Sequence, residues 1–243
     1  MKQNPDYLKF LKDKRVIIVG PAESLLERGN GEFIDSFDIV VRVNRGIEPT
    51  FLNSKKIGSR TDILYNCMLE KDDNGGKIDL NMLKLKNVKF VSYHSQVSYE
   101  GKAEPIKPYH IDNGKLTIMN SFLNTHMIDH NFYNSISSQV NCRPNTGFIA
   151  IFDLLFHQVK ELYITGYTFY MDGFMKGYKD HLDNDFINRA YTSKRHVQKN
   201  LFKFLKKTVK NDPRINTDPI LTKILTLDKL KKDKETLDYV FSE

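Results

Sequence analysis

Short apolar runs rich in β-branched residues set the strongest limit on how this chain folds. Five such runs occur, at 15–19 (RVIIV), 38–43 (DIVVRV), 61–65 (TDILY), 88–92 (VKFVS) and 160–165 (KELYIT). Runs this short and this apolar are typical of strands buried on both faces of a parallel sheet. Helical stretches lie between them, so the sequence predicts an α/β fold around a mainly parallel sheet. No internal repeat or low-complexity tract occurs, and we expect residues 1–243 to form a single domain.

The charge balance favours anionic partners. The 243 residues have a formal net charge of +7, which suits sugar nucleotides, acidic glycans, nucleic acids and lipid surfaces alike. Cys67 and Cys142 belong to no Cys-x-x-Cys pair, which argues against a disulfide scaffold and a structural zinc site. The N-terminal stretch has no signal-like apolar run, and no segment has the length of a membrane span. We therefore expect a cytoplasmic protein.

Three segments are predicted to be helical. Residues 148–156 are apolar on nearly every side, which indicates a buried helix. Residues 186–209 combine apolar residues at helical spacing with Lys and Arg, so they predict one amphipathic helix with a basic outer face. The tail at 218–240 repeats this pattern more weakly. Residues 94–118 and 168–184 lack periodicity and are expected to be long loops, which often carry function.

Two loops are candidate anion sites. Gly20 and Pro21 follow the first strand, and Pro144-Asn145-Thr146-Gly147 precede the buried helix. Exposed amides at the start of a helix bind phosphate well. The first loop matches neither G-x-G-x-x-G nor the P-loop pattern. Residues alone also allow an ordinary strand-to-helix turn at the first loop and a plain Asn or Thr N-cap at the second.

The spacing of the histidines gives little indication of a metal site. His126 and His130 are four residues apart and would share one face of a helix, but HMIDH lacks the Glu of H-E-x-x-H. His157 ends the buried helix and is expected to stabilise its C-terminus. His181 and His196 lie beyond the last predicted strand, in or beside the second long loop. Ligands bind beyond the carboxyl ends of parallel strands, where a neutral imidazole accepts a hydroxyl proton at neutral pH.

Two stretches resemble the sialyl motifs of glycosyltransferase family 29, the sialyltransferases. The large motif, G-x-x-I-D-S-x-D-x-V-x-R-x-N, is matched in register by Gly31, Ile34-Asp35-Ser36, Asp38, Val40, Arg42 and Asn44. The small motif, P-S-T-G followed by an apolar helix, a strand and Y-G-F, resembles Pro144–Gly147 through Gly166-Tyr167. The motifs occur in the order usual for the family, and the resemblance covers about residues 14–205.

The chain departs from the family pattern at several positions. Val16 and Gln158 stand where animal members have a pair of cysteines, and the Golgi anchor is missing, so the chain looks like a soluble bacterial or viral relative. Pro21 stands where the family has the Asn of a Gly-Asn pair, and Asn145 replaces a Ser. The last motif is usually His-x-x-x-x-Glu; His196 fits the His, but Leu201 stands in place of the Glu.

The resemblance implies a Rossmann-like fold of the variant GT-A type and an inverting transfer of an acidic keto-sugar, sialic acid or Kdo, from a CMP-activated donor. His196 would be the base that deprotonates the acceptor hydroxyl, and His181 would stabilise the departing phosphate. No metal or other cofactor is implied. The implied donor-binding residues are Gly20, Pro21, Ala22, Asn44, Asn145, Thr146, Gly147, Gly166 and Tyr167.

Two other functions compete with this interpretation. The changes at Pro21 and Leu201 suit a non-catalytic relative that binds a nucleotide or an acidic glycan. The lysines of the 186–209 helix and the KLKKDK run at 229–234 suit a nucleic-acid or membrane-surface protein. We expect no nucleic acid as partner, but a glycan or glycolipid acceptor and a peripheral contact with anionic membrane. Acceptor choice is expected to depend on residues 94–118 and 168–184.

Overall fold

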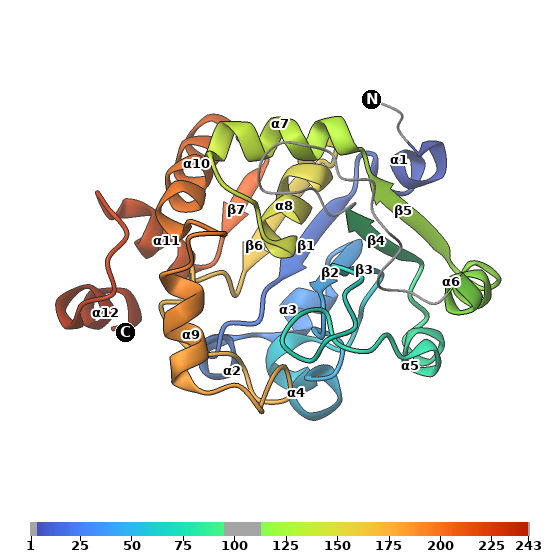
Figure 1. The fold of residues 1–243 in the computed structure, drawn as a ribbon, viewed down its shortest axis with the longest axis horizontal. Coiled ribbons are helices and arrows are strands. Elements are labelled where there is room, and N and C mark those ends of the chain that lie inside the picture. Colours follow the sequence, from blue (N-terminus) through green and yellow to red (C-terminus); the bar gives the residue numbers. More distant parts are fainter. Residues whose placement is uncertain (1–3, 95–112, 243) are drawn as a thin grey trace.

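The computed structural model describes residues 4–94 and 113–242, and within them seven parallel strands form one sheet in the order β5-β4-β3-β2-β1-β6-β7 (Figure 1). Their bounds are β1 Arg15–Val19, β2 Ile39–Val43, β3 Ile63–Tyr65, β4 Phe90–His94, β5 Asn124–Ile128, β6 Glu161–Thr165 and β7 Ile215–Thr217. The chain builds the sheet outward from β1 to β5 and then returns to place β6 beside β1. The α/β prediction with a mainly parallel sheet is therefore confirmed.

Helices cover both faces of the sheet. One face packs against α1 Pro5–Leu11, α7 His130–Val140, α8 Thr146–Phe156, α10 Gln198–Asn211 and α11 Pro219–Thr226. The last helix, α12 Lys234–Phe241, packs against α11 at the outer edge of this layer (Figure 1). The other face packs against α2 Leu25–Arg28, α3 Gly31–Asp35, α4 Thr50–Ile57, α5 Leu80–Leu85 and α6 Asn113–Asn120. Alternate residues of β1 point to opposite faces of the sheet. Val16 and Ile18 pack in the core of the first face, and Ile17 and Val19 pack in the core of the second. Double-sided burial explains why the strand is apolar throughout.

All five predicted strands are present, but the sequence missed the two edge strands. β5 (NTHMI) is partly exposed, with Met127 at 57%, and has no apolar run. β7 (INT) has only three residues. Edge strands are buried less than central ones, so their sequences carry a weaker apolar signal.

The prediction of one helix over 186–209 was wrong. The segment forms α9, Asn184–Tyr191, and α10, with a break between them. Within the break the Ser193 hydroxyl oxygen accepts the backbone N–H groups of Arg195 and His196, each at 3.2 Å. Such local side-chain bonds compete with helix formation. The break places His196 on a connection rather than on a helix face.

The two long loops differ from each other. The loop predicted at 168–184 is irregular over residues 168–183, apart from a bridge between Phe174 and Ala22, while Asn184 begins α9. In the other segment, His94 ends β4, residues 113–118 belong to α6, and 95–112 lie outside the described residues. The tail at 218–240 forms α11 and α12, which agrees with its helical spacing. Across residues 4–94 and 113–242, no helix has both the length and the apolarity needed to cross a membrane.

Candidate active site

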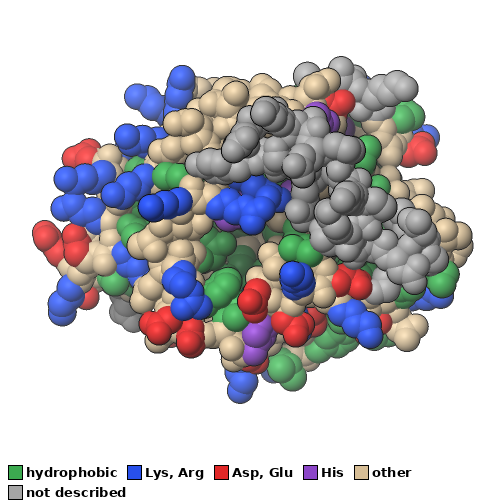
Figure 2. All heavy atoms as spheres, in the orientation of Figure 1, with side chains coloured by type: hydrophobic (Ala, Val, Ile, Leu, Met, Phe, Trp, Pro, Cys, Tyr) green, Lys and Arg blue, Asp and Glu red, His purple; other side chains and the backbone are tan. Residues whose placement is uncertain are grey.

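A cavity of about 440 Å³ opens at the carboxyl ends of the central strands. It lies beyond β1 and β6, where the chain order reverses, and open α/β sheets bind ligands at this kind of switch point. Its size falls within the range of about 300–1,000 Å³ found for small-molecule sites. Figure 2 shows it as a hollow near the centre of one face, with hydrophobic side chains inside and Lys or Arg side chains next to it.

Two glycines allow the floor of the cavity to form. Gly166 follows β6 with a φ of +71°, a conformation that favours glycine. A Cβ on Gly20 would lie 2.2 Å from the Gly166 carbonyl oxygen, and one on Gly166 would lie 2.7 Å from that of Gly20. The Ala22 amide donates to the Gly166 carbonyl at 3.2 Å. The loops after β1 and β6 therefore meet backbone to backbone. Gly20 supports this contact and does not itself line the cavity.

The N-terminus of α8 forms one wall. The Asn145 side chain caps the helix by accepting the Phe148 amide at 2.9 Å, which leaves the start of the helix at Thr146 and Gly147 beside the cavity. Residue 147 must be small, because a Cβ there would lie 2.9 Å from the Tyr167 ring. The positive end of the helix dipole and its free amides suit an anion. The N-cap and the anion-site interpretations are therefore compatible.

Asn44 projects from the end of β2. Its φ of +51° is in the left-handed region, which Asn tolerates better than most residues. Its side-chain oxygen accepts the Cys67 amide at 3.1 Å, which fixes the side chain at the cavity wall. Of the large-motif residues, Asn44 is the one that reaches the cavity.

Other residues of that motif support the scaffold. Arg42 is buried, and its guanidinium donates to the carbonyls of Arg60 and Ile57 at 3.0 and 2.6 Å. Burial lowers the pKa of Arg42 to about 10, although the charges of Asp35 and Asp62 oppose this effect. Asp35 accepts the Ser59 amide at 2.8 Å. These contacts join β2 to the turn before β3.

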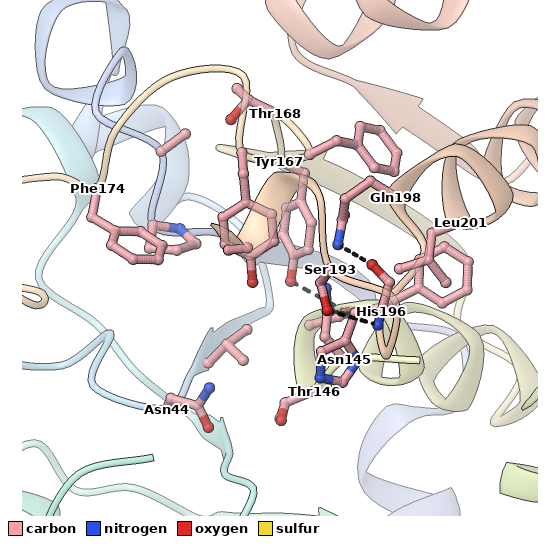
Figure 3. A pocket seen from close by; sticks show the side chains of 18 of the residues that line it. Asn44, Asn145, Thr146, Tyr167, Thr168, Phe174, Ser193, His196, Gln198 and Leu201 are labelled. Atoms are coloured by element: carbon pink, nitrogen blue, oxygen red, sulfur yellow. Dashed lines mark hydrogen bonds between the residues drawn. The ribbon is translucent and has the colours of Figure 1, made fainter. Parts of the chain in front are cut away.

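His196 lies across the cavity from Asn44 (Figure 3). Its Nδ1 is 2.7 Å from the Arg143 carbonyl oxygen, so the neutral ring donates from Nδ1 and keeps a lone pair on Nε2. Burial lowers the pKa of His196 to about 4; the hydrogen bond to the Arg143 carbonyl opposes this effect, and the charges of Arg143 and Arg195 add to it. The ring is therefore neutral at pH 7. A backbone carbonyl orients it, while Leu201, which stands where the family has Glu, is fully buried at the cavity wall.

The structure brings most of the predicted site residues together. His196 lines the cavity together with Pro21, Ala22, Asn44, Asn145, Thr146, Gly147, Gly166 and Tyr167. Pro21 lies before the first helix beyond β1, because α2 starts at Leu25 and Ala22 pairs with Phe174. His181 is not part of the wall; its side chain is 40% exposed, with Nε2 3.5 Å from Oδ1 of Asp73.

Sequence reasoning missed the charged residues of the wall. Arg143, Lys179, Arg189 and Arg195 outnumber the carboxylates Asp73 and Asp172 there. Burial lowers the pKa of Lys179 to about 8. Arg143 and Arg195 each stand next to a motif residue, Pro144 and His196, whereas Lys179 lies in the segment 168–184, which was expected to be a loop. The net positive lining suits an anionic ligand.

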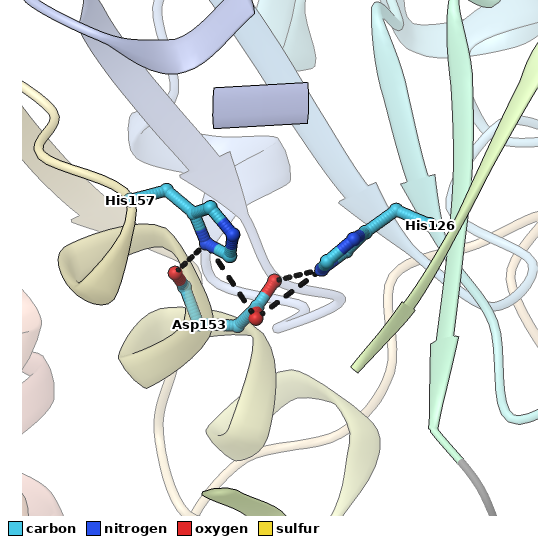
Figure 4. A group of neighbouring side chains, drawn as sticks. All are labelled: His126, Asp153 and His157. Carbon is cyan, nitrogen blue, oxygen red and sulfur yellow. Dashed lines mark hydrogen bonds and ion pairs between the residues drawn. The ribbon is translucent and has the colours of Figure 1, made fainter. Parts of the chain in front are cut away.

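A second polar cluster lies in the core, away from the cavity (Figure 4). His126 is on β5 and His130 begins α7, so the expectation that they share a helix face was wrong. Instead His126 Nε2 lies 3.1 Å from Asp153 Oδ2, and His157 Nδ1 lies 2.7 Å from the Asp153 backbone oxygen. His157 thus closes the end of α8, near the place expected for it.

These three side chains have the composition of a metal site, with candidate ligand atoms within 4.8 Å of one another. Both facing ring nitrogens already donate to Asp153, and Tyr65 donates to its Oδ2 at 2.5 Å. His126 Nδ1 and His157 Nε2 are buried without a hydrogen-bond partner among the described residues. A metal would turn these two nitrogens into unpaired N–H donors, whereas ligating histidines normally donate to a second-shell acceptor. A hydrogen-bonded network fits the cluster better.

Comparison with solved structures relates the fold to sialyltransferases. The sialyltransferase CstII from Campylobacter jejuni in complex with cytidine-5'-monophosphate matches at a TM-score of 0.50 and 19% identity, over 93% of this chain and 96% of that one. A variant of CST-II in complex with CMP matches at a TM-score of 0.51 and 18% identity, over 84% and 80% of the two chains. At these identities the likeness is one of fold, and it confirms the Rossmann-like class. No protein-family model matches the sequence, and the comparison with curated proteins gives no match.

Proposed function

We propose that this protein is a sialyltransferase-like glycosyltransferase. It transfers an acidic keto-sugar, sialic acid or Kdo, from a CMP-activated donor to a hydroxyl of a glycan or glycolipid, with inversion at the anomeric carbon. One observation carries the proposal: a buried neutral histidine, His196, lines the same cavity as the N-terminus of α8 and the motif residue Asn44.

The acid–base chemistry follows from the tautomer of His196. Its Nδ1–H donates to the Arg143 carbonyl, so Nε2 accepts the proton of the acceptor hydroxyl as the oxygen attacks the anomeric carbon. A carbonyl stabilises the resulting imidazolium less than a carboxylate would, because it carries no full charge. We therefore expect His196 to be a weaker base than a histidine oriented by Glu.

The departing CMP needs compensation for the charge on its phosphate. The amides of Thr146 and Gly147 at the start of α8 supply it, with the arginines of the wall nearby. The proposal assigns no phosphate contact to His181, because that side chain lies outside the cavity wall. It includes no metal, since a monophosphate leaving group is matched by helix amides and side-chain cations.

Release of CMP from CMP-sialic acid and CMP-Kdo, measured with EDTA present, tests the proposal. We expect release from one donor and a fall of at least about 100-fold in the His196→Ala variant. The exposed loop variant His181→Ala is the matched control and should retain activity. Release that His196→Ala leaves unchanged, or that EDTA abolishes, would contradict the mechanism.

A non-catalytic nucleotide- or glycan-binding relative is the alternative. Pro21 and Leu201 favour it, since both line the cavity and neither offers the hydrogen bond of the family residue that it replaces. A binding protein would gain thermal stability with CMP but release none from either donor.

We also propose a peripheral contact with anionic membrane. Lys199, Lys203, Lys207 and Lys210 are exposed and follow one another at helical spacing on α10. Binding to vesicles that contain an anionic lipid should fall steeply as the salt concentration rises. The double variant Lys203→Glu, Lys207→Glu should bind these vesicles more weakly than the wild type. Neutral vesicles should bind neither the wild type nor the double variant.

A further inference from the structure

Lys179 is a buried cation in the wall of the cavity. It lies in the segment 168–183 and is only 7% exposed. Its ammonium donates to the Asp73 backbone carbonyl at 2.7 Å, and no second acceptor lies within hydrogen-bond distance among the described residues. An ammonium group has three N–H donors. Most of its hydrogen-bonding capacity is therefore unused within the part of the chain that the structure describes.

The surroundings of Lys179 compensate its charge only weakly. The rings of Phe174, Tyr178 and Phe186 have centroids 5.7, 5.7 and 5.8 Å from Nζ, which is near the outer limit of about 6 Å for cation–π attraction. These three aromatic residues all line the cavity, as does Asp73, so the ammonium is enclosed by cavity-wall residues.

No carboxylate of residues 4–94 or 113–242 forms an ion pair with Lys179. The Asp73 side chain attracts the ammonium from a distance, but it is 64% exposed and its Oδ1 faces His181. Arg45 repels the ammonium, and the Cys67 thiol stays neutral because burial raises its pKa. The pKa of Lys179 is accordingly lowered to about 8, mainly by burial. A buried charge normally has a partner, since an unpaired one is costly.

We propose that Lys179 binds an anionic oxygen group of the nucleotide donor, either the phosphate or the carboxylate of the activated sugar. The inference rests on the proposed function for the identity of the ligand. The bound anion would supply the missing partner of the ammonium. It would also link the 168–183 segment and the turn at Asp73 to the ligand, because Lys179 belongs to that segment and its ammonium donates to the Asp73 carbonyl.

Binding measurements on a graded set of ligands test this role. Calorimetry at neutral pH would compare cytidine, CMP and the analogue CMP-3FNeuAc on the wild type, Lys179→Met and Lys179→Arg. A hydrogen bond to a charged group contributes about 1.5–3 kcal/mol, so Lys179→Met should weaken the recognised ligand by about 10- to 100-fold. Lys179→Arg should restore most of the affinity.

The ligands distinguish the two anionic groups. Loss of affinity for CMP and the analogue, with cytidine unchanged, assigns the phosphate. Loss for the analogue alone assigns the sugar carboxylate. Equal losses for all three ligands, or no loss for any, would overturn the inference and leave Lys179 as a link between two loops.

A direct titration separates charge from structure. Reductive methylation with ¹³C labels each lysine without removing its charge, and comparison with Lys179→Arg assigns the Lys179 signal. CMP or the analogue should raise the pKa of Lys179 above about 8, because a bound anion favours the charged form. An unchanged pKa under saturating ligand contradicts the inference.

The binding and turnover experiments distinguish a failure of the Lys179 inference from a failure of the proposed reaction. If the nucleotides bind with the expected Lys179 dependence but neither CMP-sugar releases CMP, the proposed reaction is wrong and the inference about Lys179 stands. If CMP is released yet Lys179→Met binds every ligand like the wild type, the reaction stands and the inference is wrong. A wild-type protein that binds none of the nucleotides overturns both.

Discussion

Replacing Asp153 with Ala should cost this protein a large part of its stability. The Asp153 carboxylate is almost fully buried between β5 and α8 and accepts hydrogen bonds from two side chains, at 2.5 Å from the Tyr65 hydroxyl and 3.1 Å from His126 Nε2. Tyr7 adds a further hydroxyl, 2.6 Å from that of Tyr65. The network therefore links α1, β3, β5 and α8 in the largest core.

The magnitude follows from the donors that lose their acceptor. Each buried donor left unpaired costs about 1–3 kcal/mol, and removing one partner of a buried charged network commonly costs about 3–5 kcal/mol. With two donors affected, we expect Asp153→Ala to lower the free energy of unfolding by about 3–5 kcal/mol. Asp228→Ala, at an exposed position, should change it by less than about 0.5 kcal/mol.

Urea unfolding followed by circular dichroism measures both values, and a double-mutant cycle tests the cause. Tyr65→Phe removes the bond to Asp153, so it should be costly in the wild type and cost less than about 1 kcal/mol in Asp153→Ala. Additive losses would mean that Tyr65 and Asp153 do not act together. A loss below about 1 kcal/mol for Asp153→Ala alone would refute the assignment of Asp153 as the shared acceptor.

Two further predictions concern the cavity. Because the pKa of His196 falls from 6.5 to about 4 on folding, the unfolded chain binds more protons below pH 6.5, and the free energy of unfolding should fall as pH drops towards 4. In urea unfolding, the free energy of unfolding of His196→Asn should fall by about 3 kcal/mol less than that of the wild type over this pH range. Equal falls would contradict burial of the neutral ring. The pKa of His157 is also lowered, so His157 contributes the same pH dependence to both proteins. Gly166→Ala should cost at least about 2 kcal/mol, because its φ of +71° disfavours a Cβ that would also lie 2.7 Å from the Gly20 carbonyl oxygen. Gly173→Ala, where the Cβ meets the flexible Glu23 side chain, is the control, and similar drops in melting temperature for the two variants would contradict the close approach of the loops.

The sequence predicted the centre of the fold better than its edges. Strands buried on both faces, such as β1 and β2, leave an apolar run that needs no tertiary information. β5 and β7 gave no such run, and the break before α10 depends on hydrogen bonds of Ser193 that periodicity does not register. Local sequence patterns indicate which residues are buried. They do not predict where the hydrogen bonds of a single side chain end a helix.

The candidate site was predicted in part, for a related reason. Asn44 and the segment at Asn145 lie within motifs, so their shared position at the cavity was expected. Lys179 lies in an irregular segment, where the sequence pattern predicts neither the direction of a side chain nor its burial. The carbonyl that orients His196 belongs to the backbone of Arg143. A backbone acceptor leaves no trace in the side-chain sequence.

The burial of Arg42 has a consequence for inferring activity from sequence. In the large motif, which carries the strongest resemblance, Arg42 donates to main-chain carbonyls, and of the motif residues Asn44 alone lines the cavity. A chain that had lost every reactive group would still need this arginine to hold two neighbouring strands together. A match to this pattern therefore indicates the fold. A search for the pattern would find active enzymes and inactive relatives alike.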